Sequence, residues 1–428
     1  MQSVSTCARA PWRTLLLFIP TLAAACAFAQ AADLWPLAFQ EALQVAEQRS
    51  ARLTAQEAAV GAVGEQVARA RELPDPKLRL GLDNVPVSNP DAFSLTRDFM
   101  TMRRIGYMQD VPNADKRRAR GERAEREQSV EAATLAAQRT QVRQDTALAW
   151  LELYYAERSL QAVTRLQEAL RLEAETTGPA VAGGRMSPAN AVGARAAAET
   201  VQDRILEQQR AVARARAAFS ALVGEAADRP LGPPPNIETL AHAPHTLVAD
   251  IDAHPDQRVF AQREALAESE VALAASARKS DWSWEVSFGQ REPRFSNMVS
   301  VMVTMDLPFW RAQRQDRDVA ARVKQLEQAR AMREDARRMH EAEVRMLVAD
   351  WSYAGQRVAQ FEKKVLPLTR ERSALALAAY RGGRGELASV LEARRAETEV
   401  ELSRLSAELE RARAWARLNY LFDHEVKP

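Results

Sequence analysis

The sequence predicts a mainly α-helical protein with a small β part, built from two similar halves. The first observation is a strand that runs into a proline and then opens a very long, charged, Ala-rich helix. This unit occupies Met100–Arg120 and recurs at Met298–Arg322. The second observation is four short segments in which apolar and polar residues alternate, a pattern typical of strands with one apolar face. A unit that recurs in the second half of a chain indicates internal duplication.

The duplication organises the chain into two repeats rather than into unrelated domains. We expect a signal peptide, a first repeat, a Pro-rich linker between the repeats and a second repeat, at residues 1–29, 30–223, 224–254 and 255–428. Each repeat is expected to contain a helix, two strands, a long helix and a further helix.

The N-terminus has the pattern of a secretory signal. Arg9 and Arg13 precede an apolar run from Thr14 to Phe28, which is shorter than the ~20 residues that a spanning helix needs. Small residues then favour cleavage near Ala29, which would leave the mature chain without cysteine and exclude disulfides. Lipidation at Cys26 is the alternative, because the residues before it loosely resemble a lipoprotein box.

The first repeat begins with a helical pattern from Leu37 to Glu72, which Pro74 and Pro76 end. The alternating segments that follow, Lys77–Asn84 and Met100–Asp110, predict two strands. From Asn113 to Thr177 the chain has no proline, so a continuous helix would be on the order of 95 Å long. No compact globule holds such a helix, and the length indicates a coiled coil or an elongated tube.

Gly178-Pro179 is expected to break this helix, and Ser187-Pro188 to start the next, which runs to Val223. The linker that follows is rich in proline, is expected to contain one short helix, and carries three histidines. We interpret them as loop residues rather than metal ligands, and the sequence predicts no metal site and no cofactor. They are His242, His245 and His254.

The second repeat is expected to contain the same elements as the first, in the same order. We predict a helix over Pro255–Arg278, strands over Asp281–Gly289 and Met298–Asp306, and a very long helix over Trp310–Tyr380 with a kink at Pro367. The glycines after Tyr380 end that helix, and the last one is expected over Glu386–Leu421.

Composition excludes several function classes. Lys and Arg number 59 against 57 for Asp and Glu, so the chain has no net basic field for a nucleic acid. The sequence has no nucleophile–base cluster, phosphate loop or zinc motif, and we therefore predict that the protein is not an enzyme.

Alternating strands in an exported protein suit a membrane β-barrel, since open sheet edges leave backbone groups unpaired in lipid. Four strands cannot close alone; two copies would give a barrel filled by side chains, and three would give twelve strands and a water-filled lumen. A homotrimeric channel is therefore favoured if the strands lie in a membrane. The expected lipid-facing residues are Leu78, Leu80, Leu82, Ile105, Tyr107, Trp282, Trp284, Val286, Phe288, Val299, Val301 and Val303. The alternative is a soluble periplasmic coiled-coil scaffold that carries a small sheet.

Over nearly the whole mature length, the chain resembles the outer membrane factor family of TolC-like channels. The resemblance rests on four motifs in order and spacing: the helix that ends in Leu73-Pro74-Asp75-Pro76, the Gln109-Asp110-Val111-Pro112 junction, its Asp306-Leu307-Pro308 copy, and Tyr380 to Ala393. Pro74-Asp75-Pro76 and the basic run Lys116–Arg120 are most similar to the heavy-metal (CzcC/CusC-like) branch.

The resemblance implies a trimer in the outer membrane of a Gram-negative bacterium, with a twelve-stranded barrel and a large periplasmic barrel of long antiparallel helices. It implies partners as well: a periplasmic adaptor (membrane fusion) protein and an inner-membrane efflux pump of the resistance-nodulation-division type. The expected function is the exit duct of this tripartite efflux system, for heavy-metal ions; drugs or type I secreted proteins are the alternative cargo.

Residue roles follow from the family's helix tips. The resemblance implies adaptor contacts at Arg185, Ser187, Arg384 and Glu386. It implies a periplasmic gate at Glu392, Ser389, Asn190 and Tyr380, where Ser389 and Asn190 stand at positions at which carboxylates are common. Three Glu392 carboxylates around a narrow axis would attract cations. The alternative for each is an ordinary turn, cap or solvated helix residue.

Overall fold

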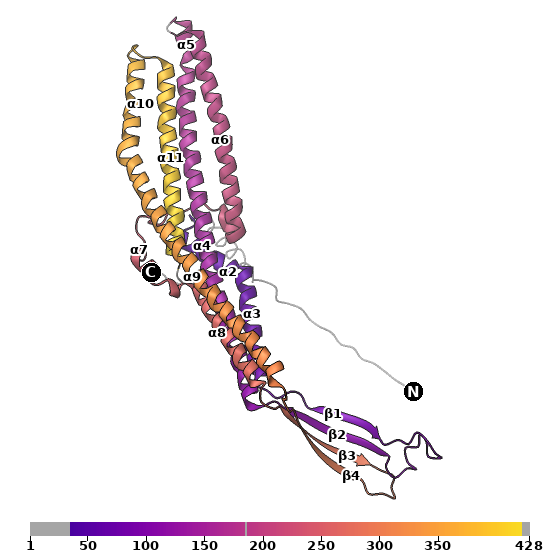
Figure 1. Ribbon diagram of the computed structural model, residues 1–428. Helices are drawn as coiled ribbons and strands as arrows, with labels where there is room; N and C mark the ends of the chain where they lie inside the picture. Colours follow the sequence, from indigo (N-terminus) through magenta and orange to yellow (C-terminus); the bar gives the residue numbers. More distant parts are fainter. Residues whose placement is uncertain (1–34, 185, 422–428) are drawn as a thin grey trace, which may run out of the picture.

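The computed structural model describes residues 35–184 and 186–421 and is elongated, with long helices at one end and a four-stranded sheet at the other (Figure 1). This mainly helical fold with a small antiparallel sheet confirms the predicted fold class. The predicted signal peptide, Cys26 and Arg185 lie outside the described residues.

The first half contains α2 (Phe39–Arg49), α3 (Ala51–Ala70), β1 (Lys77–Asp83), β2 (Met102–Val111), α4 (Ala114–Glu175), α5 (Thr177–Ala182) and α6 (Pro188–Val223). The linker contains η2 (Gly224–Asp228), α7 (Pro244–Ala249) and η3 (Ile251–Ala253). The second half contains α8 (Pro255–Ser276), β3 (Trp282–Gln290), β4 (Met298–Met305), η4 (Arg311–Gln313), α9 (Gln315–Gln360), the π-helix η5 (Phe361–Val365), α10 (Leu366–Arg381) and α11 (Leu387–Asn419).

Two boundaries in the first half differ from the prediction. The helix expected over Leu37–Glu72 is two helices, because Ser50 is extended and its hydroxyl accepts a hydrogen bond from the Leu53 N–H that starts α3. The long helix ends at Glu175, and Gly178-Pro179 lies inside the short α5 rather than forming the break. The prediction for Ser187 is correct: its side chain caps α6 and Pro188 is the first helical residue.

The second long helix also differs. It begins at Gln315 rather than Trp310, because Trp310 has a left-handed backbone with φ 57° and leads into η4. The disturbance expected at Pro367 lies just before it, in η5. Proline has no N–H to donate and its ring crowds the carbonyl four residues earlier, and a wider π-turn relieves both problems.

The sheet is a plain antiparallel meander in the order β1-β2-β3-β4. The pairing aligns Leu80 with Ile105, Ile105 with Phe288, and Phe288 with Val299. Residues that face each other across strands point to the same side of a sheet. One apolar face therefore extends over all four strands.

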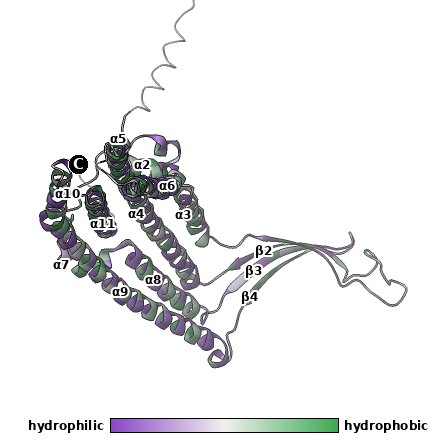
Figure 2. Cartoon of the chain, turned by 90° about the horizontal axis from the view of Figure 1, so that it is seen from above, coloured by the Kyte–Doolittle hydropathy of each residue, from purple (hydrophilic) through white to green (hydrophobic). Residues whose placement is uncertain are grey.

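The helices lie side by side in the order of the strands. Nearest the sheet, α3 packs on α4, α4 on α8 and α8 on α9, while β1 follows α3 and β4 precedes α9. Farther from the sheet the order is α6, α4, α11 and α10. Seen from above, the sheet projects away from the helices (Figure 2). The chain is thus a curved wall with two long open edges.

The main core lies where α2, α4, α6 and α11 meet. Trp150 is fully buried, and its ring contacts Phe39 edge-on at a centroid distance of 5.4 Å. A second cluster lies between the upper helices and includes Val163, Leu170 and Val390. Small alanines fill much of the remaining interface, which lets long helices approach closely with few aromatic residues.

The linker crosses the helices and is fixed to them by its backbone. The indole N–H of Trp351 donates to the carbonyl of Ile237 at 3.0 Å, and the indole N–H of Trp415 donates to the carbonyl of Thr239 at 2.9 Å. The short helix expected in the linker is α7, and its Leu247 is buried among residues of α9 and the end of α11.

Candidate functional site

One face of the sheet exposes a continuous row of large apolar side chains over all four strands. All twelve residues predicted to face lipid lie on this face, and all except Trp284 are exposed. Trp284 is half-buried beside Tyr107, with ring centroids 5.6 Å apart. A continuous apolar patch of this kind marks a surface that another apolar phase or partner covers.

The opposite face of the sheet is polar, and its side chains pair with one another. Ser283, Glu285 and Ser287 are buried there, and Arg79 reaches from β1 across β2 to pair with Glu285 at 3.0 Å. Gly106 lies between them and leaves room for the crossing, because a Cβ at that position would lie 3.1 Å from the Glu285 carboxylate oxygen, which is closer than most Cβ contacts. The two faces therefore differ as the lipid side and the lumen side of a barrel differ.

Both edge strands present unpaired backbone groups. Among the described strands β1 pairs with β2 alone and β4 with β3 alone. Residues of β4 are exposed on both sides. An open, apolar edge of this length is a template for pairing with another chain.

The two helical turns far from the sheet lie together at the other end of the molecule (Figure 1). Ser187 is exposed, and its hydroxyl is engaged by the Asn190 N–H at 3.2 Å. The α10–α11 turn is closed by Gly383, whose φ of 69° favours glycine, and by the Arg384 N–H, which donates to the Ala379 carbonyl. The side chains of Arg384 and Glu386 are exposed at this tip.

The four predicted gate residues lie at the same end of the helices but differ in environment. Asn190 is exposed in the first turn of α6, and Ser389 and Glu392 are exposed near the start of α11. Glu392 forms an ion pair with Arg372 of α10 at 3.0 Å. Tyr380 is half-buried against the upper apolar cluster, so it contributes to packing within the chain.

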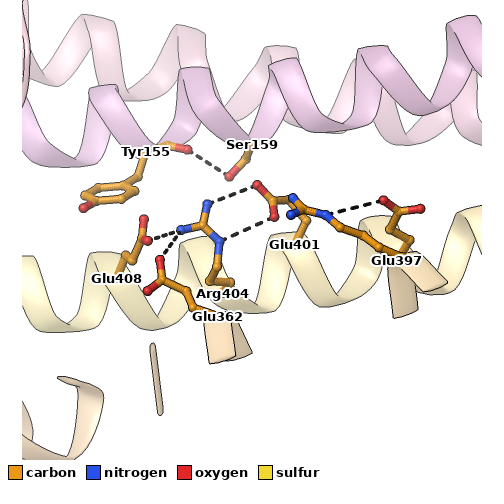
Figure 3. Close-up of polar contacts among 8 residues, drawn as sticks. Tyr155, Ser159, Glu362, Glu397, Glu401, Arg404 and Glu408 are labelled. Atoms are coloured by element: carbon orange, nitrogen blue, oxygen red, sulfur yellow. Dashed lines mark hydrogen bonds and ion pairs between the residues drawn. The ribbon is translucent and has the colours of Figure 1, made fainter. Parts of the chain in front are cut away.

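A charged network that the sequence analysis missed joins α11 to the π-helix (Figure 3). Arg404 donates to Glu401 at 3.1 Å, to Glu362 of η5 at 3.2 Å, and to Glu408. Burial raises the pKa of Glu408, and the Glu362 and Glu401 carboxylates add to this while Arg404 opposes it. Burial would lower the pKa of Arg404, but hydrogen bonding to Glu401 and the surrounding carboxylates raises it. The spacing of Glu401, Arg404 and Glu408 on one helix face was the available signal.

A second missed feature concerns one of the linker histidines. His254 is buried at the start of α8, where its Nδ1 accepts the Asp256 N–H at 3.1 Å and its ring lies 4.0 Å from that of His340 on α9. Burial and the adjacent His340 lower the pKa of His254 to about 3. Over residues 35–184 and 186–421, no cluster of three His, Cys, Asp or Glu side chains is arranged to hold a metal ion.

In the part of the chain that the structure describes, no helix is both long enough and apolar enough to cross a bilayer.

The comparisons with known proteins concern the fold. The sequence matches no family model and no curated protein. Among solved structures, the outer-membrane channel OprN is similar with a TM-score of 0.74 and 16% identity, covering 90% of this chain and 89% of OprN. CusC, described for its transmembrane channel formation, has a TM-score of 0.75 and 15% identity, covering 92% and 94%. The CmeC outer membrane channel of Campylobacter jejuni has a TM-score of 0.76 and 12% identity, covering 91% and 87%. The chain therefore has the fold of the outer membrane factor, or TolC-like, channels.

Proposed function

We propose that the protein is one subunit of a homotrimeric channel in the outer membrane of a Gram-negative bacterium, and that the channel is the exit duct of a tripartite efflux system. The observation that carries the proposal is the apolar face that extends over β1–β4 between two unpaired edges. Three copies supply the twelve strands that give a barrel a water-filled lumen.

The polar face supports the same arrangement. A lumen-facing surface of a membrane barrel carries polar side chains, and the Arg79–Glu285 pair together with buried serines provides them. The long helices carry mixed charge along their length and would extend the lumen into an aqueous compartment.

A membrane assay separates this function from a soluble coiled-coil scaffold. The mature chain, expressed with its own N-terminus, is expected in the outer-membrane fraction and, after extraction in detergent, at three times the mass of one subunit. The purified trimer is expected to give discrete conductance steps in a planar bilayer. A soluble monomer in the periplasmic fraction would favour the scaffold and end the channel proposal.

We further propose that the partners are a periplasmic adaptor and an inner-membrane pump of the resistance-nodulation-division type. The exposed tips support this, because Ser187, Arg384 and Glu386 present polar groups at the end far from the sheet. Pull-down of the adaptor by the wild-type trimer, compared with an Arg384→Glu, Glu386→Arg trimer, tests the contact: the double variant is expected to lose binding while it remains in the outer membrane.

For the cargo we propose heavy-metal ions, with drugs or type I secreted proteins as the alternative. The support is the resemblance of Pro74-Asp75-Pro76 and the basic run after Pro112 to the heavy-metal branch. Deletion of the gene is expected to raise sensitivity to copper, silver, zinc, cobalt or cadmium. If resistance to all of these metals is unchanged and sensitivity to drugs is higher, the channel carries drugs rather than heavy-metal ions.

A further inference from the structure

Four methionines of the described strands lie on the polar face of the sheet. The pairing of the strands places them on the same side as Arg79, Glu285 and Ser287. They are Met102 and Met108 on β2, and Met298 and Met302 on β4. Met305 lies on the other face, among the valines of β4. Methionine that only fills gaps is expected among apolar side chains, so its position on the polar face indicates another role.

The charged groups of the polar face are already paired with one another. The ion pairs are Lys77–Asp110 at 2.6 Å, Arg79–Glu285 at 3.0 Å and Arg104–Asp83 at 2.7 Å. Each carboxylate that the described strands place on this face therefore has a cationic partner. The polar donors that remain are hydroxyl groups and the thioether sulfurs of methionine. Thioethers favour soft ions such as Cu(I), whereas carboxylates and carbonyls suit harder ions.

Two of the thioethers approach each other at the end of the sheet that is farther from the helices (Figure 1). The sulfur of Met102 lies 3.1 Å from the position that a Cβ on Gly289 would occupy. Gly289 is aligned with Met298 on the neighbouring strand, and side chains of aligned residues start about 5 Å apart. Met298 is 47% exposed, so its flexible side chain has room to turn toward Met102. Both sulfurs can therefore reach one ion above Gly289.

The other two thioethers flank Glu285, nearer to the helices. Met108 is aligned with Glu285 on one side and Met302 on the other, each starting about 5 Å from it. Met302 is 55% exposed. Along β4, Met298 and Met302 are four residues apart, which is about 14 Å at the rise of a strand. The methionines thus occupy two levels of the sheet, one near each end.

We propose that these four methionines form two successive binding levels for a soft monovalent cation, Cu(I) or Ag(I). The inference rests on the proposed exit duct and narrows its cargo from heavy-metal ions in general to soft monovalent ones. In the trimer, each level receives two thioethers from each of three chains, and both levels line the lumen. A conducting path needs sites that are favourable enough to enter and weak enough to leave. Neutral thioethers meet this need, because they attract the ion without adding a negative charge that would retain it.

Binding of Ag(I) to the purified trimer tests the two levels. A chain called the lumen variant loses the four sulfurs and keeps apolar side chains of similar size; it carries Met102→Leu, Met108→Leu, Met298→Leu and Met302→Leu. The matched control loses four methionines that lie off the polar face; it carries Met305→Leu, Met332→Leu, Met339→Leu and Met346→Leu.

Isothermal titration of silver nitrate in chloride-free buffer is expected to show binding to the wild-type and control trimers and its loss in the lumen variant. Zn(II), titrated in the same way, should not distinguish the three proteins, because it prefers nitrogen, thiolate and carboxylate ligands. Equal binding of Ag(I) by the lumen variant and the wild-type trimer would overturn the proposal. Loss of binding in the control as well would also overturn it, since the ion would then not depend on the polar face.

Resistance in cells tests whether the two levels act in transport. A strain that carries the lumen variant is expected to lose resistance to copper and silver and to keep its resistance to zinc, cobalt and cadmium. A strain as resistant to silver as the wild type contradicts the proposal.

Conductance of the same purified samples in a planar bilayer reports the duct separately. If the lumen variant conducts like the wild type and binds Ag(I) equally well, the thioether levels are wrong and the exit duct stands. If the wild-type chain forms no conducting trimer, the exit duct fails, and the thioether levels fail with it.

Discussion

Asp281 and Asn113 are joined by two hydrogen bonds that connect the two halves of the chain at the level where helices become strands. The Asp281 Oδ1 accepts the backbone N–H of Asn113 at 2.9 Å and its side-chain amide at 3.0 Å, and its other oxygen pairs with Lys116. Asn113 in turn caps α4 by accepting the Lys116 N–H at 2.8 Å. One carboxylate thus fixes the start of the longest helix against the start of β3.

Replacing this carboxylate should therefore weaken the junction. Asp281→Ala leaves the Asn113 N–H without its acceptor and is expected to lower the free energy of unfolding by about 1–3 kcal/mol. Asp281→Asn keeps one acceptor oxygen and should lose less. Urea unfolding followed by circular dichroism measures both. Asp115→Ala, which removes an exposed ion pair with Lys279, is the control and should cost less than either; a larger cost for it would contradict this account.

Neighbouring residues of β4 test which face of the sheet meets lipid. Val301→Arg places a charge on the apolar face and is expected to cost about 2–4 kcal/mol if it lies near the midplane of the bilayer, which should abolish trimers in the outer membrane. Ser300→Arg is the matched control on the polar face of the same strand and should assemble. Trimers are measured on gels without boiling. Equal loss in both variants would mean that the polar face does not line a lumen.

The exposed carboxylate of Glu392 is expected to set ion preference at the helix tips. Glu392→Gln should reduce the preference of the conducting trimer for cations over anions, and Ser389→Asp, which adds a charge one turn earlier, should increase it. The reversal potential in a planar bilayer under a salt gradient measures both. Glu399→Gln is the control, because Glu399 lies farther along α11 and pairs with Arg204. Unchanged reversal potentials in both test variants would remove Glu392 from the gate.

The buried His254 should make the fold sensitive to acid. Its pKa is about 3 when folded against an ordinary value of 6.5, so the neutral ring is the form that the fold stabilises. Its contribution is complete above about pH 6.5 and is lost as the pH falls toward about 3. His340, Asp256 and Glu343 are the titratable groups nearest to it. Burial raises the pKa of Asp256, so protonation of this carboxylate at low pH favours the folded state and partly offsets the loss of stability caused by His254.

His254→Asn keeps a helix-capping side chain and removes the titration, so its melting temperature should fall less between pH 7 and pH 4 than that of the wild-type protein. Replacement of the exposed His245 by Asn is the control and should leave the wild-type pH dependence intact. An identical pH dependence in the His254 variant would show that other groups govern acid stability.

The strands were predictable because their signal is local. Leu78, Leu80 and Leu82, and likewise Trp282 to Phe288, alternate strictly with polar residues, and period-2 alternation specifies a face without knowledge of the partners. The strand–proline–helix junctions were found for the same reason, and the observed strands begin and end within two residues of the predicted ones.

The structure differs from the prediction where a contact between residues distant in sequence, or an unusual backbone conformation, determines the local structure. The sequence predicts the kink at Pro367, but the preceding turn, which Glu362 links to Arg404, carries the irregularity. His254 lies outside the helices, as the sequence predicts, but its burial could not be predicted, because its neighbour His340 lies far along the sequence and the burial depends on how α8 packs on α9. Trp310 could not be recognised as a left-handed residue, since a bulky side chain rarely adopts that conformation.

The two tryptophan anchors of the linker also determine where the molecule can bend. Trp351 in α9 and Trp415 in α11 each donate to a carbonyl of the linker, which clamps these helices at one level against sliding. The π-helix lies just above that clamp, and α10 continues from it to the free tip. A sideways displacement of the tip would therefore bend the chain at Phe361–Val365, where the regular α-helical hydrogen bonding is interrupted, and would leave the helices below the clamp in place.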